Sequence, residues 1–319
     1  MEIKHSLKAV VKQTGLSPFL IRAWERRYNA ISPSRSSSKR RLYTDEDINR
    51  LTLLKKVTQC GENIGNIANL ANDDLRKIIG ENSIMNNQFP IINEDGKNNL
   101  TANDYFSQAL DSIQESNFEE FEAKLMEASV ALSFPSLLDQ VISPLLDKVG
   151  TMWQNGELRI ADEHRISAII RSFLGSFVKS DRRSASDRCL VSTTPTGQFH
   201  ELGALMASLS ASVMGWRSIF LGPNLPPEEI AGAVKANNAS VLALSMIYPM
   251  DDPYLGAELI RIRRLIGDDV QILVGGRAAA NYHGFIEDIS GIYISNLEEM
   301  REHLESSFNQ NLSNRNINE

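Results

Sequence analysis

A single histidine stands inside a seven-residue stretch that begins and ends with glycine, reading Gly-Gln-Phe-His-Glu-Leu-Gly over residues 197–203. Residues 188–194 read as a short buried strand and the apolar run 202–214 as a helix, so His200 lies in the loop between them. In an open parallel sheet, ligands bind at the loops that follow the strands. Because imidazole is a metal ligand and a proton carrier, His200 is either a ligand-binding residue or an ordinary loop histidine.

Three neighbours of His200 favour ligand binding. Gly197 and Gly203 have no side chains and allow a large group to come close to the backbone. Gln198 lies two residues before the histidine and is expected to orient the imidazole through a hydrogen bond. The expected site is thus a histidine held in one orientation beside open space.

The chain after His200 alternates strands with helices. Strands are predicted at 218–222, 241–246, 271–275 and 291–295, with helices at 227–237 and 255–266. Together with the strand before His200, they predict a doubly wound, five-stranded parallel sheet of the flavodoxin (Rossmann-like) type. Ser245 ends one of these strands, and Gly275 and Gly276 end the next. Because the ends of adjacent parallel strands form one rim, we expect these residues to share a crevice with His200.

The segment 105–180 has a helical pattern with room for four helices. Apolar residues recur at helical spacing from Phe118 to Leu125 and from Leu137 to Val149. Pro135 marks a helix start, and Pro144 marks a kink or a new first turn.

Trp153 and the pair Glu163-His164 are separated by nine residues that contain a turn. We expect the three side chains to converge at one end of the bundle. The alternative is that Trp153 is a core residue and that Glu163 and His164 are solvated or cap a helix.

The net charge of −7 conceals an asymmetry along the chain. Residues 1–77 carry 15 Lys and Arg against 8 Asp and Glu, a balance of +7, whereas residues 78–319 carry 18 against 32, a balance of −14. A basic domain on an acidic body is typical of a nucleic-acid-binding domain joined to another module.

The basic domain has the pattern of a winged helix-turn-helix. A first helix is predicted to end at Thr14-Gly15-Leu16, and Ser17-Pro18 to begin a second helix that runs to about Tyr28. Residues 32–43 form a polar, basic loop that enters a short strand, as a wing does, and Thr44 caps a third helix. The residues expected to contact DNA are Arg22, Arg26, Arg27, Arg35, Lys39, Arg40, Arg41 and Tyr43.

Two runs closely resemble the winged-helix domain of MerR-family regulators: Ile21-Arg-Ala-Trp-Glu-Arg-Arg-Tyr28 and Arg40-Arg-Leu-Tyr-Thr-Asp-Glu-Asp-Ile48. The resemblance covers roughly residues 5–72. It implies a transcriptional regulator, not an enzyme, that binds double-stranded operator DNA as a homo-oligomer, either a dimer or a tetramer. MerR proteins often dimerise through a coiled coil after the wing. Here the Asn- and Asp-rich residues 81–104 look like a linker, so oligomerisation is expected elsewhere.

The second half resembles cobalamin-binding domains, in which Asp-x-His-x-x-Gly, Ser-x-Leu and Gly-Gly motifs hold the vitamin. The resemblance implies that His200 is the lower cobalt ligand and that Gly203 completes its motif. It also implies that Ser245 contacts the buried dimethylbenzimidazole, while Gly275 and Gly276 line the channel of the nucleotide tail.

Trp153, Glu163 and His164 match the Trp-nine residues-Glu-His motif of CarH/LitR-type photoreceptor repressors, where it covers the upper face of adenosylcobalamin. The resemblance implies a repressor that senses light through this cofactor, with light altering its oligomeric state and DNA affinity. Two positions depart from the pattern. Gln198 stands where the family has Asp or Glu, and Gln154 stands where some members carry a histidine that captures cobalt after photolysis.

Two other functions are compatible with these motifs. A cobalamin-independent MerR-type regulator would keep the fold without the vitamin, and Gln198 favours it. A corrinoid carrier protein for methyl transfer would share the bundle, the histidine loop, the serine and the glycine pair. Its function gives no reason for a DNA-binding domain.

The expected organisation is multidomain, α followed by α/β. It comprises a winged-helix domain at 1–77, a linker at 78–104, a helical bundle cap at 105–180, a cobalamin-binding domain at 187–306 and a disordered tail at 307–319. With no stretch of about 20 apolar residues and no signal-like start, the protein is expected to be cytoplasmic. Cys60 and Cys189 lack metal-ligand spacing and are expected to be buried.

Overall fold

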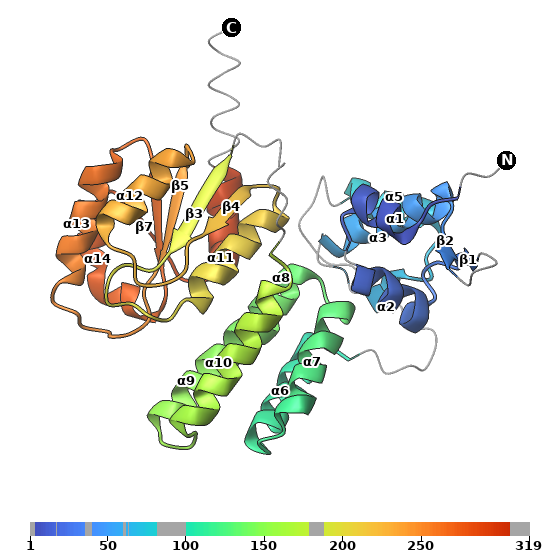
Figure 1. Ribbon diagram of the computed structural model, residues 1–319, viewed down its shortest axis with the longest axis horizontal. Coiled ribbons are helices and arrows are strands. Elements are labelled where there is room, and N and C mark those ends of the chain that lie inside the picture. Colours follow the sequence, from blue (N-terminus) through green and yellow to red (C-terminus); the bar gives the residue numbers. More distant parts are fainter. Residues whose placement is uncertain are drawn as a thin grey trace, which may run out of the picture. The chain divides into compact units, whose positions relative to one another are not determined.

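The computed structural model describes residues 4–16, 18–35, 40–59, 62, 64–81, 100–178 and 188–306 (Figure 1). The chain divides into two compact units, Met1–Ile166 and Ser167–Glu319. Among the described residues, no helix is both long enough and apolar enough to cross a membrane.

The first part of the chain has the predicted helix-turn-helix and wing. Its elements are α1 (Leu7–Thr14), α2 (Pro18–Tyr28), β1 (Ser34–Arg35), β2 (Arg41–Leu42), α3 (Asp45–Gln59), α4 (Ile64–Ile67) and α5 (Asn72–Glu81). Helix α1 ends at Gly15, whose φ of 66° lies in the left-handed region that favours glycine. Thr44 and Asp47 exchange hydrogen bonds of 2.8 and 3.1 Å where α3 begins, which confirms the predicted cap. Ser17, the predicted cap of α2, lies outside the described residues.

The bundle follows as α6 (Ala102–Gln114), α7 (Phe118–Ala131), α8 (Phe134–Leu137), a π-helical turn (Leu138–Ile142), α9 (Ser143–Gln154) and α10 (Ile160–Gly175). Helix α8, the π turn and α9 follow without a break, so the segment forms the four predicted helical rods. The predicted irregularity at Pro144 is the π turn. Proline has no N–H to donate and its ring crowds the preceding turn, so the helix widens and Ser143 N–H bonds Leu138 O five residues back.

The C-terminal part contains a five-stranded sheet in the order β4-β3-β5-β6-β7, with every neighbouring pair parallel. Its elements are β3 (Cys189–Thr193), α11 (Leu202–Val213), β4 (Arg217–Phe220), α12 (Pro227–Ala236), β5 (Val241–Ser245), α13 (Leu255–Ile266), β6 (Gln271–Gly275), a 3-10 helix (Arg277–Tyr282), α14 (His283–Asp288) and β7 (Ile292–Ile294). This order confirms the predicted flavodoxin-type sheet. The 3-10 helix, α14 and a further helix at 297–306 were not predicted.

Two apolar layers enclose the sheet. Helices α12 and α13 pack on one face around Val191, Leu242 and Ile272, and α11 with residues 297–306 packs on the other around Leu190 and Val241. Cys189 is buried as predicted, and its burial raises the pKa of the thiol. Strands β3 and β5 are buried along their whole length, so their C-terminal ends lie at the centre of the sheet edge.

Candidate functional site

The loop that carries His200 is held at several points. The Thr194 hydroxyl donates to the Gln198 carbonyl, and the Gly197 N–H donates to Asn224 Oδ1 at 2.9 Å. Gly197 has a φ of 82°, and a Cβ there would lie 2.9 Å from Asp252 Oδ2, so both backbone and space require glycine. The histidine is therefore presented by a fixed loop.

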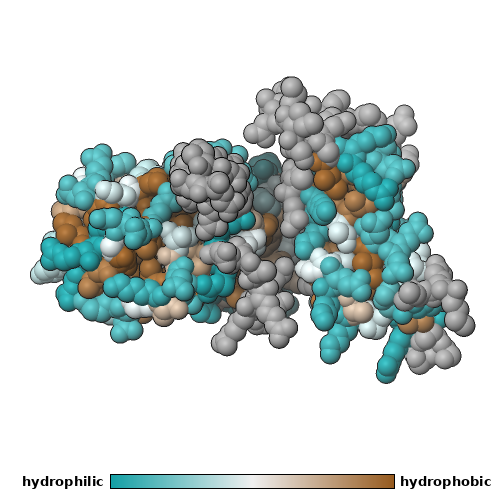
Figure 2. Space-filling view, turned by 90° about the horizontal axis from the view of Figure 1, so that it is seen from above, coloured by the Kyte–Doolittle hydropathy of each residue, from teal (hydrophilic) through white to brown (hydrophobic). Residues whose placement is uncertain are grey.

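His200 is exposed, and the aromatic ring of Tyr248 lies beside it. The Tyr248 ring stands perpendicular to the imidazole, with 6.1 Å between ring centroids and 82° between planes. Phe199 and Tyr248 are 66% and 49% exposed. Figure 2 shows hydrophobic residues among hydrophilic ones on the face that it draws. The imidazole is thus accessible to a large ligand with an apolar rim around it.

Gln198 does not bond the imidazole, contrary to the expectation from sequence. Its side chain is fully buried; Oε1 accepts from the N–H groups of Ile247 and Tyr248 at 2.8 and 3.0 Å, and Nε2 donates to the Pro249 carbonyl at 3.1 Å. The loop after β5 presents these backbone groups directly to the amide, and buried polar groups take the partners that lie within reach. Gln198 therefore joins the histidine loop to the loop after β5.

Gly203 and Ser245 form the junction between α11 and the end of β5. A Cβ at position 203 would overlap Ser245 Oγ and lie 3.4 Å from Ser245 Cβ. Ser245 is 7% exposed, and its hydroxyl bonds none of the described residues. The junction thus combines a glycine on α11 with the hydroxyl of a nearly buried serine that bonds none of the described residues.

Ser192 was missed from sequence, although it has a similar character. Its Oγ is buried in β3 and has no hydrogen-bond partner among the described residues. Ser192 lies on the same face of β3 as Leu190, two residues earlier, and the register pairs it with Ala243 of β5. Leu190 and Ala243 both pack in the apolar cluster under α11. A polar residue at an inward position of a buried strand was the available signal.

Gly275 and Gly276 lie at the end of β6, so the structure brings them, Ser245 and His200 to the ends of three adjacent strands, as predicted. Gly276 has a φ of 100°, and a Cβ there would overlap the Met246 carbonyl oxygen. A Cβ at Gly275 would lie 3.2 Å from Ile294 O. Both glycines therefore allow β6 to pass close to neighbouring backbone.

Trp153, Glu163 and His164 lie at the end of the hairpin where α9 ends and α10 begins, and the convergence of all three side chains stays a prediction. Trp153 is half-buried in the last turn of α9, and the first turn of α10 carries half-buried Glu163 and exposed His164. His164 Nδ1 lies 2.7 Å from Glu163 Oε2. Because Trp153 is only partly buried, this corner presents a tryptophan and an acid-imidazole pair at the surface.

The predicted DNA-binding residues fall into two groups. Arg22, Arg26 and Arg27 of α2 are exposed, as are Arg35 and Arg40 of the wing, and Lys39 lies outside the described residues. Arg41 Nε lies 2.6 Å from the Glu25 carboxylate, a hydrogen bond that raises the pKa of the guanidinium. Tyr43 is fully buried, and desolvation raises the pKa of its phenol. Tyr43 is therefore a core residue, which corrects its predicted DNA contact, and Arg41 links the wing to α2.

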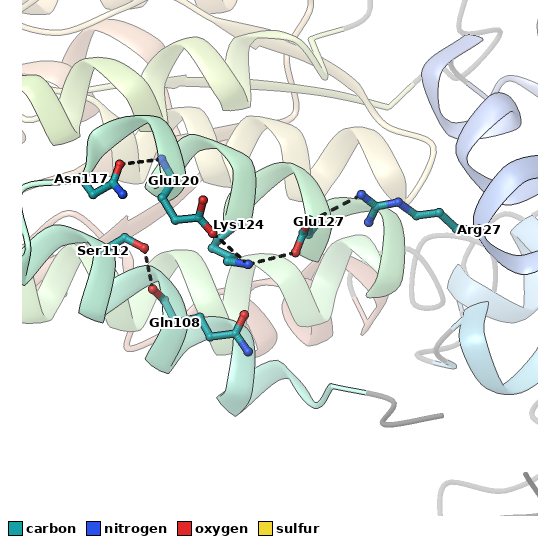
Figure 3. Close-up of polar contacts among 7 residues, drawn as sticks. All are labelled: Arg27, Gln108, Ser112, Asn117, Glu120, Lys124 and Glu127. Atoms are coloured by element: carbon teal, nitrogen blue, oxygen red, sulfur yellow. Dashed lines mark hydrogen bonds and ion pairs between the residues drawn. The ribbon is translucent and has the colours of Figure 1, made fainter. Parts of the chain in front are cut away.

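Helix α2 also contacts α7. The Trp24 indole N–H donates to the Val130 carbonyl at 3.3 Å, and Arg27 Nη2 lies 3.7 Å from Glu127 Oε1 (Figure 3). Glu127 in turn lies 3.4 Å from Lys124 Nζ. Arg27 is therefore engaged on one side by an acidic residue of the bundle, which competes with any contact to phosphate.

Comparison with known proteins decides the class. Residues 5–74 match the family described as MerR HTH family regulatory protein, and residues 105–176 and 188–305 each match a family described as B12 binding domain. The chain is a MerR-type regulator with B12-binding domains.

This MerR-type regulator has relatives that match nearly their whole length. It is 28% identical over 292 residues to the HTH-type transcriptional repressor CarH of Myxococcus xanthus, covering 91% of this chain and 94% of CarH. It is 24% identical over 296 residues to the repressor CarA of the same organism, covering 92% and 94%. These relatives are transcriptional repressors, not enzymes.

A solved structure with a similar fold is that of the monomethylamine corrinoid protein of Methanosarcina barkeri. It aligns with a TM-score of 0.53 and 14% identity, covering 65% of this chain and 100% of that chain. At this identity the likeness concerns the fold alone, a helical bundle joined to a parallel sheet.

Proposed function

We propose that this MerR-type regulator is a repressor that binds adenosylcobalamin and responds to light. In this proposal, His200 is the lower cobalt ligand, Ser245 contacts the dimethylbenzimidazole, and Gly203, Gly275 and Gly276 line the channel of the nucleotide tail. Trp153, Glu163 and His164 cover the upper face. Bound adenosylcobalamin would supply a cobalt–carbon bond that light cleaves.

The junction of Gly203 and Ser245 carries the proposal. Ser245 is 7% exposed and its hydroxyl bonds none of the described residues, and the buried Ser192 hydroxyl on the neighbouring strand β3 also lacks a partner among them, although buried hydroxyls are normally hydrogen-bonded. A ligand nitrogen inserted beside α11 would give the Ser245 hydroxyl a partner. The absence of a side chain at Gly203 lets α11 lie directly against Ser245, and exposed His200 lies three residues earlier in the chain. These residues fit a corrinoid with an extended tail.

Helix α10 carries residues that are proposed to link bound vitamin to oligomer formation. Its first turn carries Glu163 and His164, and Arg171 further along pairs with Glu201, the residue after His200. We propose that this helix holds the arrangement needed for an oligomer in the dark, which raises DNA affinity through multivalency, and that light disrupts the oligomer.

Size-exclusion chromatography of the full chain tests this function. The protein is loaded with adenosylcobalamin in the dark and chromatographed before and after green light. We expect a larger species in the dark and a smaller one after illumination. Hydroxocobalamin-loaded protein is the control, since it has no adenosyl group to lose. An unchanged elution volume with bound vitamin would refute light-dependent assembly.

The histidine itself is tested by the absorption spectrum of bound vitamin. We expect His200→Ala to lose the spectrum of a histidine-ligated corrinoid and to bind more weakly, whereas His283→Ala, on α14, retains both. An unchanged spectrum in His200→Ala would assign the lower ligand elsewhere.

A cobalamin-independent regulator is the second candidate. The hydrogen bonds of Gln198 to the loop after β5 favour it, because they leave the imidazole without the polar partner expected at that position. Protein purified with excess adenosylcobalamin and showing no corrinoid absorption would support this function over the first.

A further inference from the structure

The loop after β5 places an aromatic ring against the candidate cobalt ligand, and one buried side chain holds that loop. We propose that Tyr248 is the positioning residue for the His200 imidazole and that Gln198 acts on His200 through Tyr248. This role deepens the proposed function and rests on it, because an ordered His200 imidazole serves cobalamin binding only if His200 is the cobalt ligand.

The first step is the anchoring of the loop. Gln198 accepts the N–H groups of Ile247 and Tyr248 and donates to the Pro249 carbonyl, so one side chain fixes three consecutive residues. Gln198 is fully buried, and breaking these bonds would leave polar groups without partners in the interior. The backbone of Tyr248 is therefore held although half of its side chain is exposed.

The second step is the contact between the rings. A centroid separation of 6.1 Å and an angle of 82° describe an edge-to-face pair, a favourable arrangement for aromatic side chains. The imidazole is exposed, and it makes no hydrogen bond to any of the described residues. Contact with Tyr248 is thus the interaction that restricts its rotation about χ2.

The two steps explain how a glutamine at position 198 is compatible with an ordered imidazole at His200. A carboxylate two residues before the histidine would orient it through a hydrogen bond, whereas here the amide orients a neighbouring loop and the ring on that loop orients the histidine. The expected consequence is that removal of the Tyr248 ring releases the imidazole, while removal of its hydroxyl does not.

Nuclear magnetic resonance of the full chain without vitamin tests the orientation. The histidine rings are labelled, and the His200 signals are assigned from their loss in a His200→Gln variant. We expect Tyr248→Leu to shift the resonances of the His200 ring protons and to abolish the cross-relaxation that these protons show with the Tyr248 ring in wild type. Tyr248→Phe is expected to keep both the His200 resonance positions and the cross-relaxation with the ring at position 248. Tyr254→Leu is the matched control, since Tyr254 is an exposed tyrosine nearby in the chain, 77% exposed. His283, which packs against Tyr293, is the internal reference.

Gln198→Met tests the link between the two residues. It removes the three hydrogen bonds at nearly constant volume, and we expect the His200 signals to shift as in Tyr248→Leu although the tyrosine is still present. Tyr248→Leu changes a half-exposed side chain and keeps the inference testable should Gln198→Met fail to fold. His200 signals that move no more in Tyr248→Leu than in Tyr254→Leu would overturn the inference.

Titration with adenosylcobalamin then tests whether the orientation of His200 by Tyr248 contributes to cobalamin binding. Loss of an edge-to-face aromatic contact is expected to raise Kd about 2- to 10-fold in Tyr248→Leu, with recovery in Tyr248→Phe. Equal Kd values in wild type and Tyr248→Leu would refute a role in ligation. If wild type binds no vitamin, the proposed function fails, and the resonance experiment alone decides whether Tyr248 orients His200.

Discussion

Replacement of Gly203 by alanine tests the junction between α11 and β5. The new methyl group would overlap Ser245 Oγ, which must rotate away or push α11 from the sheet. Overpacking of this kind costs about 1–3 kcal/mol. Alanine in place of glycine inside a helix returns up to about 1 kcal/mol. We therefore expect Gly203→Ala to destabilise the sheet domain by a net of about 1 kcal/mol.

Hydrogen exchange followed by mass spectrometry measures this effect in the full chain, because it reports the opening of one domain separately from the others. A loss of 1 kcal/mol speeds exchange in peptides from β3 and β5 about fivefold. The matched control is Gly232→Ala in α12, where a Cβ meets nothing within 4 Å and exchange should slow or stay constant.

The double variant Gly203→Ala/Ser245→Ala separates the clash from other causes. Ser245→Ala removes the overlapping oxygen, which bonds none of the described residues, so the double variant should exchange nearly as slowly as wild type. It should still bind cobalamin poorly, because it lacks the Ser245 hydroxyl that is proposed to contact the dimethylbenzimidazole. A double variant as unstable as Gly203→Ala would refute the reasoning, as would a Gly203→Ala variant that is more stable than wild type.

Three further outcomes are expected. Glu127→Gln should free Arg27 and strengthen binding to duplex DNA up to about fivefold, since exposed ion pairs contribute about 0.2–1 kcal/mol. Glu122→Gln, also on α7, is the control, and the DNA affinity of both variants is measured by fluorescence anisotropy at several salt concentrations. Trp153→Ala should retain adenosylcobalamin but reduce oligomerisation in the dark, and equal sedimentation of variant and wild type would contradict this. Burial raises the pKa of Tyr105 from 10.0 to about 12, with smaller contributions from Tyr28 and Glu127. The native state then keeps a proton that the unfolded chain releases, so stability falls as pH rises from 10 towards 12. Urea unfolding followed by circular dichroism should show a weaker fall in Tyr105→Phe.

The order of the strands and the ends that carry Ser245, Gly275 and Gly276 were predictable from sequence. Buried strands are continuous apolar runs bounded by turn residues, and the alternation with helices limits the topology to few solutions. The 3-10 helix Arg277–Tyr282 and α14 were not predictable in the same way, because each is shorter than the window over which helical periodicity can be recognised.

The roles of Gln198 and Tyr43 could not be read from neighbouring residues. The hydrogen-bond partners of Gln198 are 49 to 51 positions away in the chain, and only the pairing of β3 with β5 brings them together. Tyr43 stands in a run of basic residues that indicates a DNA-facing wing. Its burial depends on a bridge to His5 and on packing under α3, neither of which the local pattern encodes.

The π turn ahead of Pro144 has a consequence for residues that it does not touch. A π turn holds one residue more than an α-helical turn, and each residue rotates a helix by about 100°. The direction in which Trp153 leaves α9 is therefore fixed nine positions upstream. A chain that lost Pro144 and relaxed to a regular helix would have to delete one residue to keep its tryptophan on the same side. Single-residue insertions and deletions between Leu138 and Ser143 would thus change the direction in which the Trp153 side chain points while the residues around it stay the same.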